Sequence, residues 1–287
     1  MAVESMGAAV EGAASRTPSR TGRNLPAAIC VGLALGIVVI GSLAFYKALF
    51  LIVVAAVIGV ALWELANALS LRGIWTPLPL MVLGSTGMLA GAFYGGSRVL
   101  VVAFASTVLV TTLWRMRRGQ DGFVQDVTAT VFCLVYAPFL ASFVALLLDA
   151  DNGVQQVVTF IVVTVASDTG GYAIGAAFGR HPMALRISPK KSWEGFAGSA
   201  AACAVAGVLC VVLLLDGDWW VGLVLGAAAV VAATLGDLAE SLIKRDLGVK
   251  DMSNILPGHG GIMDRLDSLL ATVPVVWVVL TFLLPAV

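Results

Sequence analysis

The sequence predicts an all-α polytopic membrane protein, and its composition, its hydrophobic runs and its charge placement each support this class. Apolar residues make up 60% of the 287 residues and charged residues only 12%, with a mean hydropathy of +0.99. A soluble domain carries about 25% charged residues, so this chain has too few to cover a water-exposed surface. The formal net charge is zero, which gives no argument for nucleic acid as a partner. The chain is therefore expected to lie among membrane lipids.

Hydrophobic runs predict about nine transmembrane helices. Such a helix needs about 20 predominantly apolar residues. The expected spans lie near residues 26–45, 48–68, 76–95, 98–114, 127–148, 154–178, 195–215, 219–241 and 267–286. The turn between the first two is very short, around Tyr46 and Lys47, so these two could instead form one longer helix. Residues 1–24 have no apolar period and are expected to form a disordered cytoplasmic tail.

The distribution of lysine and arginine tests this map and sets its orientation. With nine spans and a cytoplasmic N-terminus, all but two of the 17 Lys and Arg residues fall on the cytoplasmic side, the exceptions being Lys47 and Arg98. The predicted outer loops carry acidic residues instead: Asp149, Asp151, Asp216 and Asp218. We therefore expect a multi-pass protein of the cell membrane, with the N-terminus inside and the C-terminus outside.

Two long, charged cytoplasmic loops distinguish the C-terminal part of the chain. They are GRHPMALRISPKKSWEG, residues 179–195, and SLIKRDLGVKDMSNILPGHGGIMDRLDS, residues 241–268. The first half of the chain has no comparable loop. The expected organisation is therefore a tail at 1–24, a transmembrane scaffold at 25–150 and a catalytic transmembrane region at 151–287.

Acidic residues at membrane depth are costly and therefore mark candidate functional sites. One face of the eighth predicted span carries four polar residues at spacing i, i+3, i+4 and i+7, namely Asp237, Glu240, Ser241 and Lys244. Asp264 and Asp267 are spaced i, i+3 at the start of the last span. Carboxylates from two helix ends near the cytoplasmic interface form a hard-oxygen site suited to Mg²⁺. The alternative is that these acids only pair with Lys244, Arg245 and Arg265 at the water boundary.

Two further acids lie in earlier spans. Asp168 lies late in the sixth span, in SDTGGYAIGAAFG, with no neutralising neighbour, and it remains a candidate for the site. The glycines after it, Gly171, Gly175 and Gly179, have small-xxx-small spacing and are expected to serve helix packing. Glu64, in LWELANAL, is isolated, so a polar contact between helices is favoured over catalysis.

The two charged loops also predict binding of phosphate groups. PGHGG, residues 257–261, cannot be helix interior, and its glycines would let backbone N–H groups approach an anion, with His259 at the centre. Ser188, Lys190 and Lys191 in the other loop could close over a polyphosphate. Simpler explanations are a tight turn for PGHGG and a topology or lipid-headgroup role for the lysine pair. The phosphate interpretation is favoured because basic residues flank PGHGG on both sides: Lys244, Arg245, Lys250 and Arg265.

Residues 241–267 resemble the signature of the phosphatidate cytidylyltransferase (CDP-diacylglycerol synthase) family. The matching pattern is Ser241-x-Ile243-Lys244-Arg245-x4-Lys250-Asp251-x-Ser253-x2-Leu256-Pro257-x-His259-Gly260-Gly261-Ile262-x-Asp264-Arg265-Leu266-Asp267. SDTGGYAIGAAFGR and SPKKSWEG resemble the accompanying motifs, except that Ser192 stands where the family usually has Thr. The resemblance is strong over 165–270, and before that it rests only on span number and hydrophobicity.

The resemblance implies that CTP and phosphatidate react to give CDP-diacylglycerol and pyrophosphate for phospholipid biosynthesis, with Mg²⁺ and room for a second cation. It implies Asp237 and Asp264 as metal ligands. Catalytic roles are expected for Asp237, Asp264, Asp267, Lys244 and Arg265. Substrate contacts are expected for Asp168, Ser188, Lys190, Lys191, Ser241, Arg245, His259, Gly260 and Gly261. Members of the family look like dimers, so a homodimer is also expected.

Two other functions share parts of this pattern. A related CTP-using membrane enzyme, such as a polyprenol kinase or an archaeal-lipid cytidylyltransferase, would keep the carboxylates and phosphate contacts but accept another lipid. An ion or lipid transporter would use the intramembrane acids as a relay without nucleotide turnover. The continuous basic motif at 241–267 favours an enzyme over a transporter.

Overall fold

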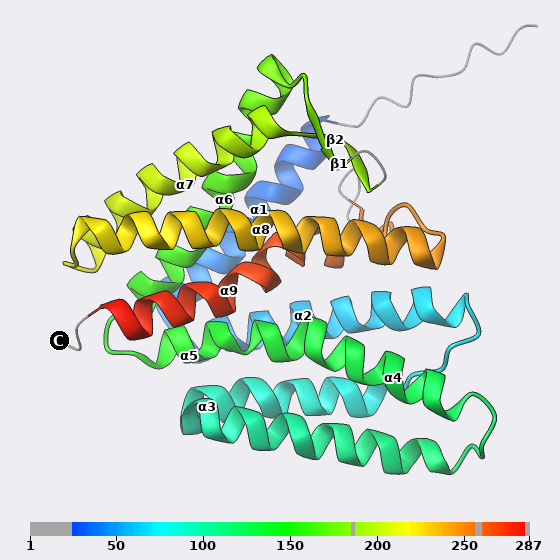
Figure 1. The fold of residues 1–287 in the computed structure, drawn as a ribbon. Coiled ribbons are helices and arrows are strands. Elements are labelled where there is room, and N and C mark those ends of the chain that lie inside the picture. Colours follow the sequence, from blue (N-terminus) through cyan, green and yellow to red (C-terminus); the bar gives the residue numbers. More distant parts are fainter. Residues whose placement is uncertain (1–24, 185–186, 256–259, 285–287) are drawn as a thin grey trace, which may run out of the picture.

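The computed structural model describes residues 25–184, 187–255 and 260–284, which form a bundle of long helices (Figure 1). The tail predicted at 1–24 and His259 lie outside these residues. The elements in chain order are α1 (Leu25–Phe45), α2 (Lys47–Ser70), α3 (Leu78–Met116), α4 (Phe123–Leu134), the π-helix η1 (Val135–Phe139), α5 (Phe143–Asp149), α6 (Gly153–Phe178), β1 (Pro182–Ala184), β2 (Ser188–Ser192), α7 (Trp193–Leu214), α8 (Trp219–Leu247) and α9 (Met263–Leu283).

Seven described helices are long and apolar enough to cross a membrane, with α4, η1 and α5 counted as one passage. This confirms an all-α, multi-pass membrane protein. The count differs from the nine predicted spans at two places. The predicted spans 76–95 and 98–114 form the single element α3, and the apolar part described for the first helix, Gly36–Phe45, is short.

Within α3 the chain reverses direction at Gly96. This residue has φ +69° and ψ −166°, a conformation that residues with a Cβ rarely adopt. The segments on either side then pack against each other, because a Cβ added at Gly84 would lie 2.2 Å from the Thr107 side chain. Figure 1 shows the resulting hairpin of two antiparallel helical segments.

Two clusters of buried apolar side chains hold the bundle together. The first joins α2, α3, α4 and part of α9, and includes Leu62, Met88, Leu134 and Met263. The second joins α5, α6, α7, α8 and the rest of α9, and includes Leu147, Val163, Leu225 and Val276. Because α9 contributes to both clusters, it connects the N-terminal helices to the C-terminal ones.

Glycines bring the C-terminal helices into close contact. A Cβ added at Gly170 on α6 would lie 2.7 Å from the Gly198 carbonyl oxygen on α7. A Cβ added at Gly236 on α8 would lie 2.5 Å from the Asp267 carbonyl oxygen on α9. Gly171 and Gly175 also face α7, so the packing role predicted for these two glycines is confirmed. Three predicted site residues, Asp168, Asp237 and Asp267, lie in the chain at or beside these crossings.

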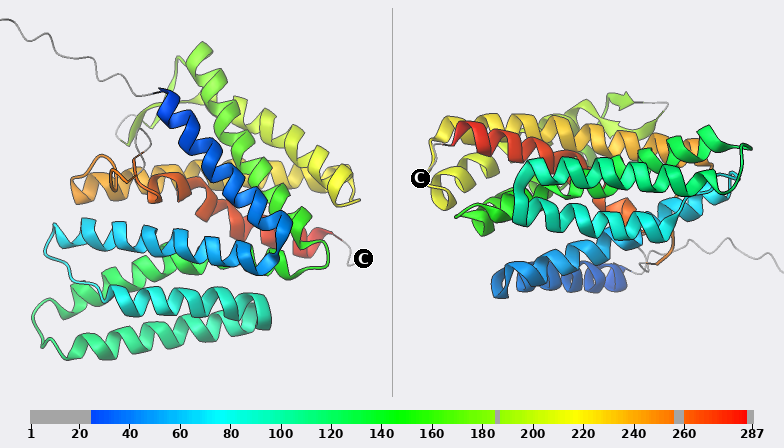
Figure 2. Two further views of the ribbon diagram at one scale, coloured as in Figure 1. Left: turned by 180° about the vertical axis from the view of Figure 1, so that it is seen from behind. Right: turned by 90° about the horizontal axis from the view of Figure 1, so that it is seen from below.

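A short antiparallel β-hairpin, which the sequence analysis did not predict, precedes α7. Pro182 pairs with Ser192, and Ala184 pairs with Ser188. Ser192 then begins the next helix, since its Oγ accepts a hydrogen bond from the Gly195 N–H at 3.1 Å and so caps α7. Both views place the hairpin at the end of the bundle where α8 stops and α9 begins (Figures 1 and 2).

Candidate active site

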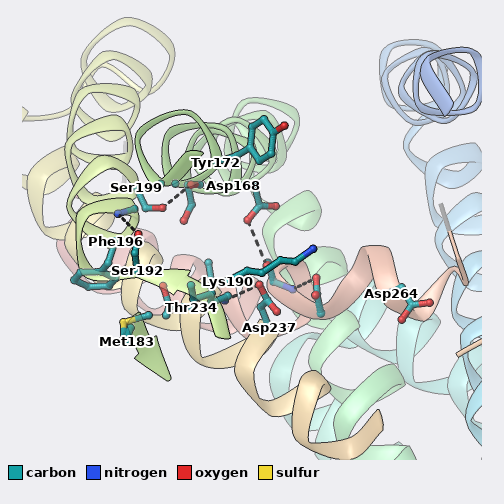
Figure 3. A pocket seen from close by; sticks show the side chains of 18 of the residues that line it. Asp168, Tyr172, Met183, Lys190, Ser192, Phe196, Ser199, Thr234, Asp237 and Asp264 are labelled. Atoms are coloured by element: carbon teal, nitrogen blue, oxygen red, sulfur yellow. Dashed lines mark hydrogen bonds and ion pairs between the residues drawn. The ribbon is translucent and has the colours of Figure 1, made fainter. Parts of the chain in front are cut away.

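A cavity of about 460 Å³ opens between α6, α7, α8, α9 and the β-hairpin. Small-molecule sites have volumes of roughly 300–1,000 Å³. The charged residues that line the cavity are Asp168, Lys190, Lys191, Asp237, Asp264, Arg265 and Asp267. Figure 3 shows several of them around the cavity, with carboxylates contributed by three different helices. Helices distant in sequence therefore bring acids and cations together in one place.

The crossing of α8 and α9 brings two of these carboxylates together. Gly236 has no side chain, so the α9 backbone approaches α8 directly at Asp267. Asp237 follows Gly236 on α8, and both Asp237 and Asp267 line the cavity. Asp168 joins them from α6, with its Oδ1 3.5 Å from the Ser268 hydroxyl on α9.

The β-hairpin supplies cations to the same cavity. Lys191 Nζ on β2 lies 2.5 Å from Asp237 Oδ2, and both side chains are only partly buried. The neighbouring Lys190 is exposed and also lines the cavity (Figure 3). The partner of Asp237 in this ion pair is therefore Lys191 of the β-hairpin, which is not one of the basic residues that the alternative named, and the pair lies at the cavity wall.

Behind the cavity, Lys244 forms a partly buried ionic group with two acids. Its Nζ lies 2.9 Å from Asp264 Oδ1 and forms an ion pair with Glu240, one helical turn earlier on α8. Glu240 is fully buried, and among the described residues its oxygens accept no hydrogen bond of good geometry. For Glu240 and Asp264, the alternative of pairing with nearby basic side chains is therefore realised.

Asp264 also holds the backbone that precedes it. Its Oδ2 accepts hydrogen bonds from the Gly261 N–H at 2.7 Å and the Met252 N–H at 3.0 Å. Gly260 adopts φ +81°, and a Cβ there would lie 2.7 Å from the same oxygen. Glycine at this position therefore allows the carboxylate to approach the backbone closely. Contact of Gly260 and Gly261 with a substrate stays a prediction.

The remaining predicted site residues lie elsewhere. In the described part of the chain, the cavity lining does not include Ser188, Ser241, Lys244, Arg245, Gly260 or Gly261. His259 lies outside the described residues, so its predicted role is untested. Sequence reasoning missed a set of small hydroxyl side chains that line the cavity: Ser167, Ser192, Ser199, Thr234 and Ser268. Three of them could have been found from the sequence. Ser167 and Ser268 are adjacent to Asp168 and Asp267, and Thr234 lies one helical turn before Asp237.

The donor set of the cavity suits a hard divalent cation. Across 25–184, 187–255 and 260–284, no Lys or Arg lies within ion-pair distance of Asp168 or Asp267. Acids at membrane depth need a partner, and carboxylate oxygens are the ligands that Mg²⁺ prefers. With the side chains as they stand, however, no described group of three or more His, Cys, Asp or Glu residues converges tightly enough to hold a metal. The cavity residues therefore match Mg²⁺ in the type of ligand atom they offer, but in the described residues they do not form a coordination shell.

Comparison with known proteins agrees with these features. Residues 26–283 match the model of the Cytidylyltransferase family. The phosphatidate cytidylyltransferase of Mycobacterium bovis is 41% identical over 279 residues, which cover 92% of this chain and 91% of that protein. The enzyme of the same name from Mycobacterium leprae is 41% identical over 286 residues, covering 94% and 91%. That from Haemophilus influenzae is 38% identical over 147 residues, covering 48% and 51%. The family match and these identities show that the chain belongs to the phosphatidate cytidylyltransferase family.

Proposed function

We propose that the protein transfers the cytidylyl group of CTP to phosphatidate, giving CDP-diacylglycerol and pyrophosphate. The observation that carries this proposal is the cavity, which combines carboxylates with basic side chains at one end of a membrane-spanning bundle. Relatives that align with more than nine-tenths of this chain, at 41% identity, are named phosphatidate cytidylyltransferase. The reaction joins a nucleotide from water to a lipid phosphate, so it needs such a site at the membrane interface.

In the reaction, a phosphate oxygen of phosphatidate attacks the α-phosphorus of CTP. The bond between the α-phosphorus and the oxygen that bridges to the β-phosphate breaks, and pyrophosphate leaves with that electron pair. The attacking oxygen is already anionic, so no dedicated general base is needed. The two reactants repel each other, and Lys190, Lys191 and Arg265 in the cavity offset that repulsion.

Asp237 and Asp264 are the proposed Mg²⁺ ligands, with Asp168 and Asp267 offering further carboxylate oxygens in the same cavity. When bound, Mg²⁺ would neutralise phosphate charge as a Lewis acid. Both oxygens of Asp264 already accept contacts from the protein, whereas the contact described for Asp237 is one salt bridge, to Lys191. Of these two acids, Asp237 is therefore the one whose oxygens are less engaged by the protein.

We infer nine membrane passes with the cavity facing the cytoplasm. Two features support the count: α3 contains two antiparallel apolar segments, and α1 covers 21 residues. Lys47 Nζ donates to the Ala150 carbonyl at 3.2 Å, so the α1–α2 turn lies beside the α5–α6 turn. The nine-pass map assigns both turns to the outer side. Labelling of single cysteines from each side of sealed vesicles would test this orientation, and outside labelling near Lys190 would refute it.

The family resemblance also implies a homodimer. Light scattering in detergent, corrected for bound detergent, would then give twice the mass of one 29.6 kDa chain. A single-chain mass at concentrations that support full turnover would contradict this inference.

A comparison of lipid acceptors tests the proposed reaction. Purified protein is given CTP and Mg²⁺ with either phosphatidate or a polyprenol, and pyrophosphate and CDP are measured. Release of pyrophosphate that depends on phosphatidate is the expected result. CDP release with the prenol would point to a lipid kinase, and lipid or ion movement across vesicles without CTP turnover would point to a transporter.

A further inference from the structure

Helix α2 does not line the cavity, yet α2 and the turn that follows it contact both ends of the α8–α9 connection. The described parts of this connection are residues 248–255 and 260–262. They lead from the C-terminus of α8, which carries Lys244, to the N-terminus of α9, which carries Asp264 and Asp267. Two side chains on or just after α2, Glu64 and Arg72, make the contacts.

Glu64 holds the beginning of α9. Its Oε1 accepts the Ile262 N–H at 2.9 Å and the Ser253 hydroxyl at 2.5 Å, and its Oε2 accepts the Met263 N–H at 2.7 Å. The side chain is fully buried, and no Lys or Arg in the described ranges lies within ion-pair distance of it. Its charge is therefore stabilised by the N-terminus of α9, where backbone N–H groups and the helix dipole favour an anion.

Gly261 makes this approach possible. A Cβ added at this position would lie 2.7 Å from Glu64 Oε1 and 2.8 Å from Oε2. Both contacts are shorter than real Cβ atoms tolerate, so any larger residue would displace the carboxylate or the start of α9. The glycine that the sequence assigns to a phosphate-binding turn thus also admits a carboxylate from α2.

Arg72 holds the other end of the connection. Its Nε donates to the Leu247 carbonyl at 3.2 Å, and its Nη2 donates to the Asp246 carbonyl at 2.5 Å. These carbonyls belong to the last turn of α8, which has no further helical turn to bond them. A cation at a helix C-terminus also complements the dipole. Helix α2 and the turn that follows it therefore place an anion at the start of α9 and a cation at the end of α8.

Asp264 interlocks with Glu64 on the same backbone. Asp264 accepts the Met252 and Gly261 N–H groups, while Glu64 accepts Ser253, Ile262 and Met263. In each described segment of the connection, one residue bonds to Asp264 and the next residue bonds to Glu64: Met252 and then Ser253 in the first segment, Gly261 and then Ile262 in the second. A shift of Glu64 would move the turn of α9 that carries Asp264 and Asp267.

We propose that α2 braces the α8–α9 connection for cytidylyl transfer, and that Glu64 is the positioning residue of this brace; the inference rests on the proposed function. Glu64 does not line the cavity in the described structure, so it acts through Asp264 and the start of α9 and not by touching substrate. The N-terminal helices therefore take part in building the active site and are more than a membrane scaffold.

Replacement of Glu64 by Gln tests the brace. Gln has the same size, but its amide puts an N–H₂ group where one of the two accepting oxygens stood, so one backbone contact is lost. Hydrogen–deuterium exchange should rise at the amides of residues 261–264. The kcat for cytidylyl transfer should fall roughly 10- to 100-fold, since misplacing reacting groups by about 1 Å costs up to that factor. The change in kcat should exceed the change in the KM for CTP.

Two further variants make the test decisive. Asn67→Ala, on an exposed position one turn along α2, should leave both exchange and kcat unchanged. Ser253→Ala removes a single hydroxyl contact and should give a smaller effect in the same direction, which keeps the test open if Glu64→Gln does not fold. A normal kcat in Glu64→Gln would overturn the proposal. So would unchanged exchange at 261–264, or a loss of activity that only follows a lower unfolding temperature.

The inference and the proposed function can fail separately. If the wild-type protein does not react CTP with phosphatidate, the proposed function is wrong. The claim that Glu64 supports cytidylyl transfer is then wrong as well. The exchange measurement needs no substrate, so it still decides whether Glu64 holds the start of α9.

Discussion

Replacing Gly236 by Ala should disable the enzyme by separating two helices. The added Cβ would lie 2.5 Å from the Asp267 carbonyl oxygen and 2.7 Å from the Ala271 Cβ. Ordinary contacts between such atoms are about 3.5–4.0 Å, so α9 must move away from α8 by about 1 Å. That movement changes the spacing of Asp237 and Asp267 across the cavity. A misplacement of this size reduces kcat roughly 100-fold, and overpacking costs about 1–3 kcal/mol of stability.

The assay for Gly236→Ala is steady-state turnover of CTP and phosphatidate by purified protein, together with the unfolding midpoint in detergent. Gly87→Ala is the matched control, because a Cβ at Gly87 on α3 would meet nothing within 4 Å. The control should keep its wild-type kcat. A Gly236→Ala protein with wild-type kcat would refute the claim that this helix crossing sets the geometry of the site.

Three other predictions test separate parts of the structure. Asp126→Ala should lower the free energy of unfolding by about 3–5 kcal/mol, because it leaves the buried Arg115 guanidinium without its 2.6 Å partner. Chemical denaturation measures this change, and a stability within error of wild type would contradict it. The kcat per folded molecule should be unchanged. Lys191→Gln removes a cation from the cavity wall and should raise the KM for CTP about tenfold, or about 1.4 kcal/mol; an unaltered KM would exclude Lys191 from phosphate binding. Chelation with EDTA should abolish turnover and excess Mg²⁺ should restore it, whereas turnover in EDTA would speak against a metal-dependent reaction.

The sequence predicted most of the bundle because lipid imposes a simple rule. Each crossing needs a long apolar run, and such runs are visible without any knowledge of neighbours. The charged segment at 241–268 was conspicuous because it interrupts these apolar runs. The sequence predicted Asp237, Glu240, Asp264 and Asp267 as one group, and Asp168 as a separate candidate, because acids are rare at membrane depth. In the described part of the chain, Asp168, Asp237, Asp264 and Asp267 line one cavity and Glu240 does not, while the roles of all five stay predictions.

Other features depend on contacts that no local pattern reports. Glu64 was expected to make an interhelical polar contact, and its partners, Ser253 and the start of α9, lie 189 or more residues away in the chain. The β-hairpin has no alternating apolar pattern, since its second strand reads SPKKS. The division into scaffold and catalytic halves followed charge density alone, and charge density does not report that Glu64 on α2 and Arg72 just after it reach the α8–α9 connection.

Transfer of the α-phosphate of CTP tests the central claim most directly. Purified protein is incubated with phosphatidate and with CTP radiolabelled at either the α- or the γ-phosphate, and the lipid is extracted. Cytidylyl transfer predicts that the α-label enters the lipid while the γ-label stays in water as pyrophosphate. Label from the γ-phosphate in the lipid, or no α-label there, would contradict the proposed reaction.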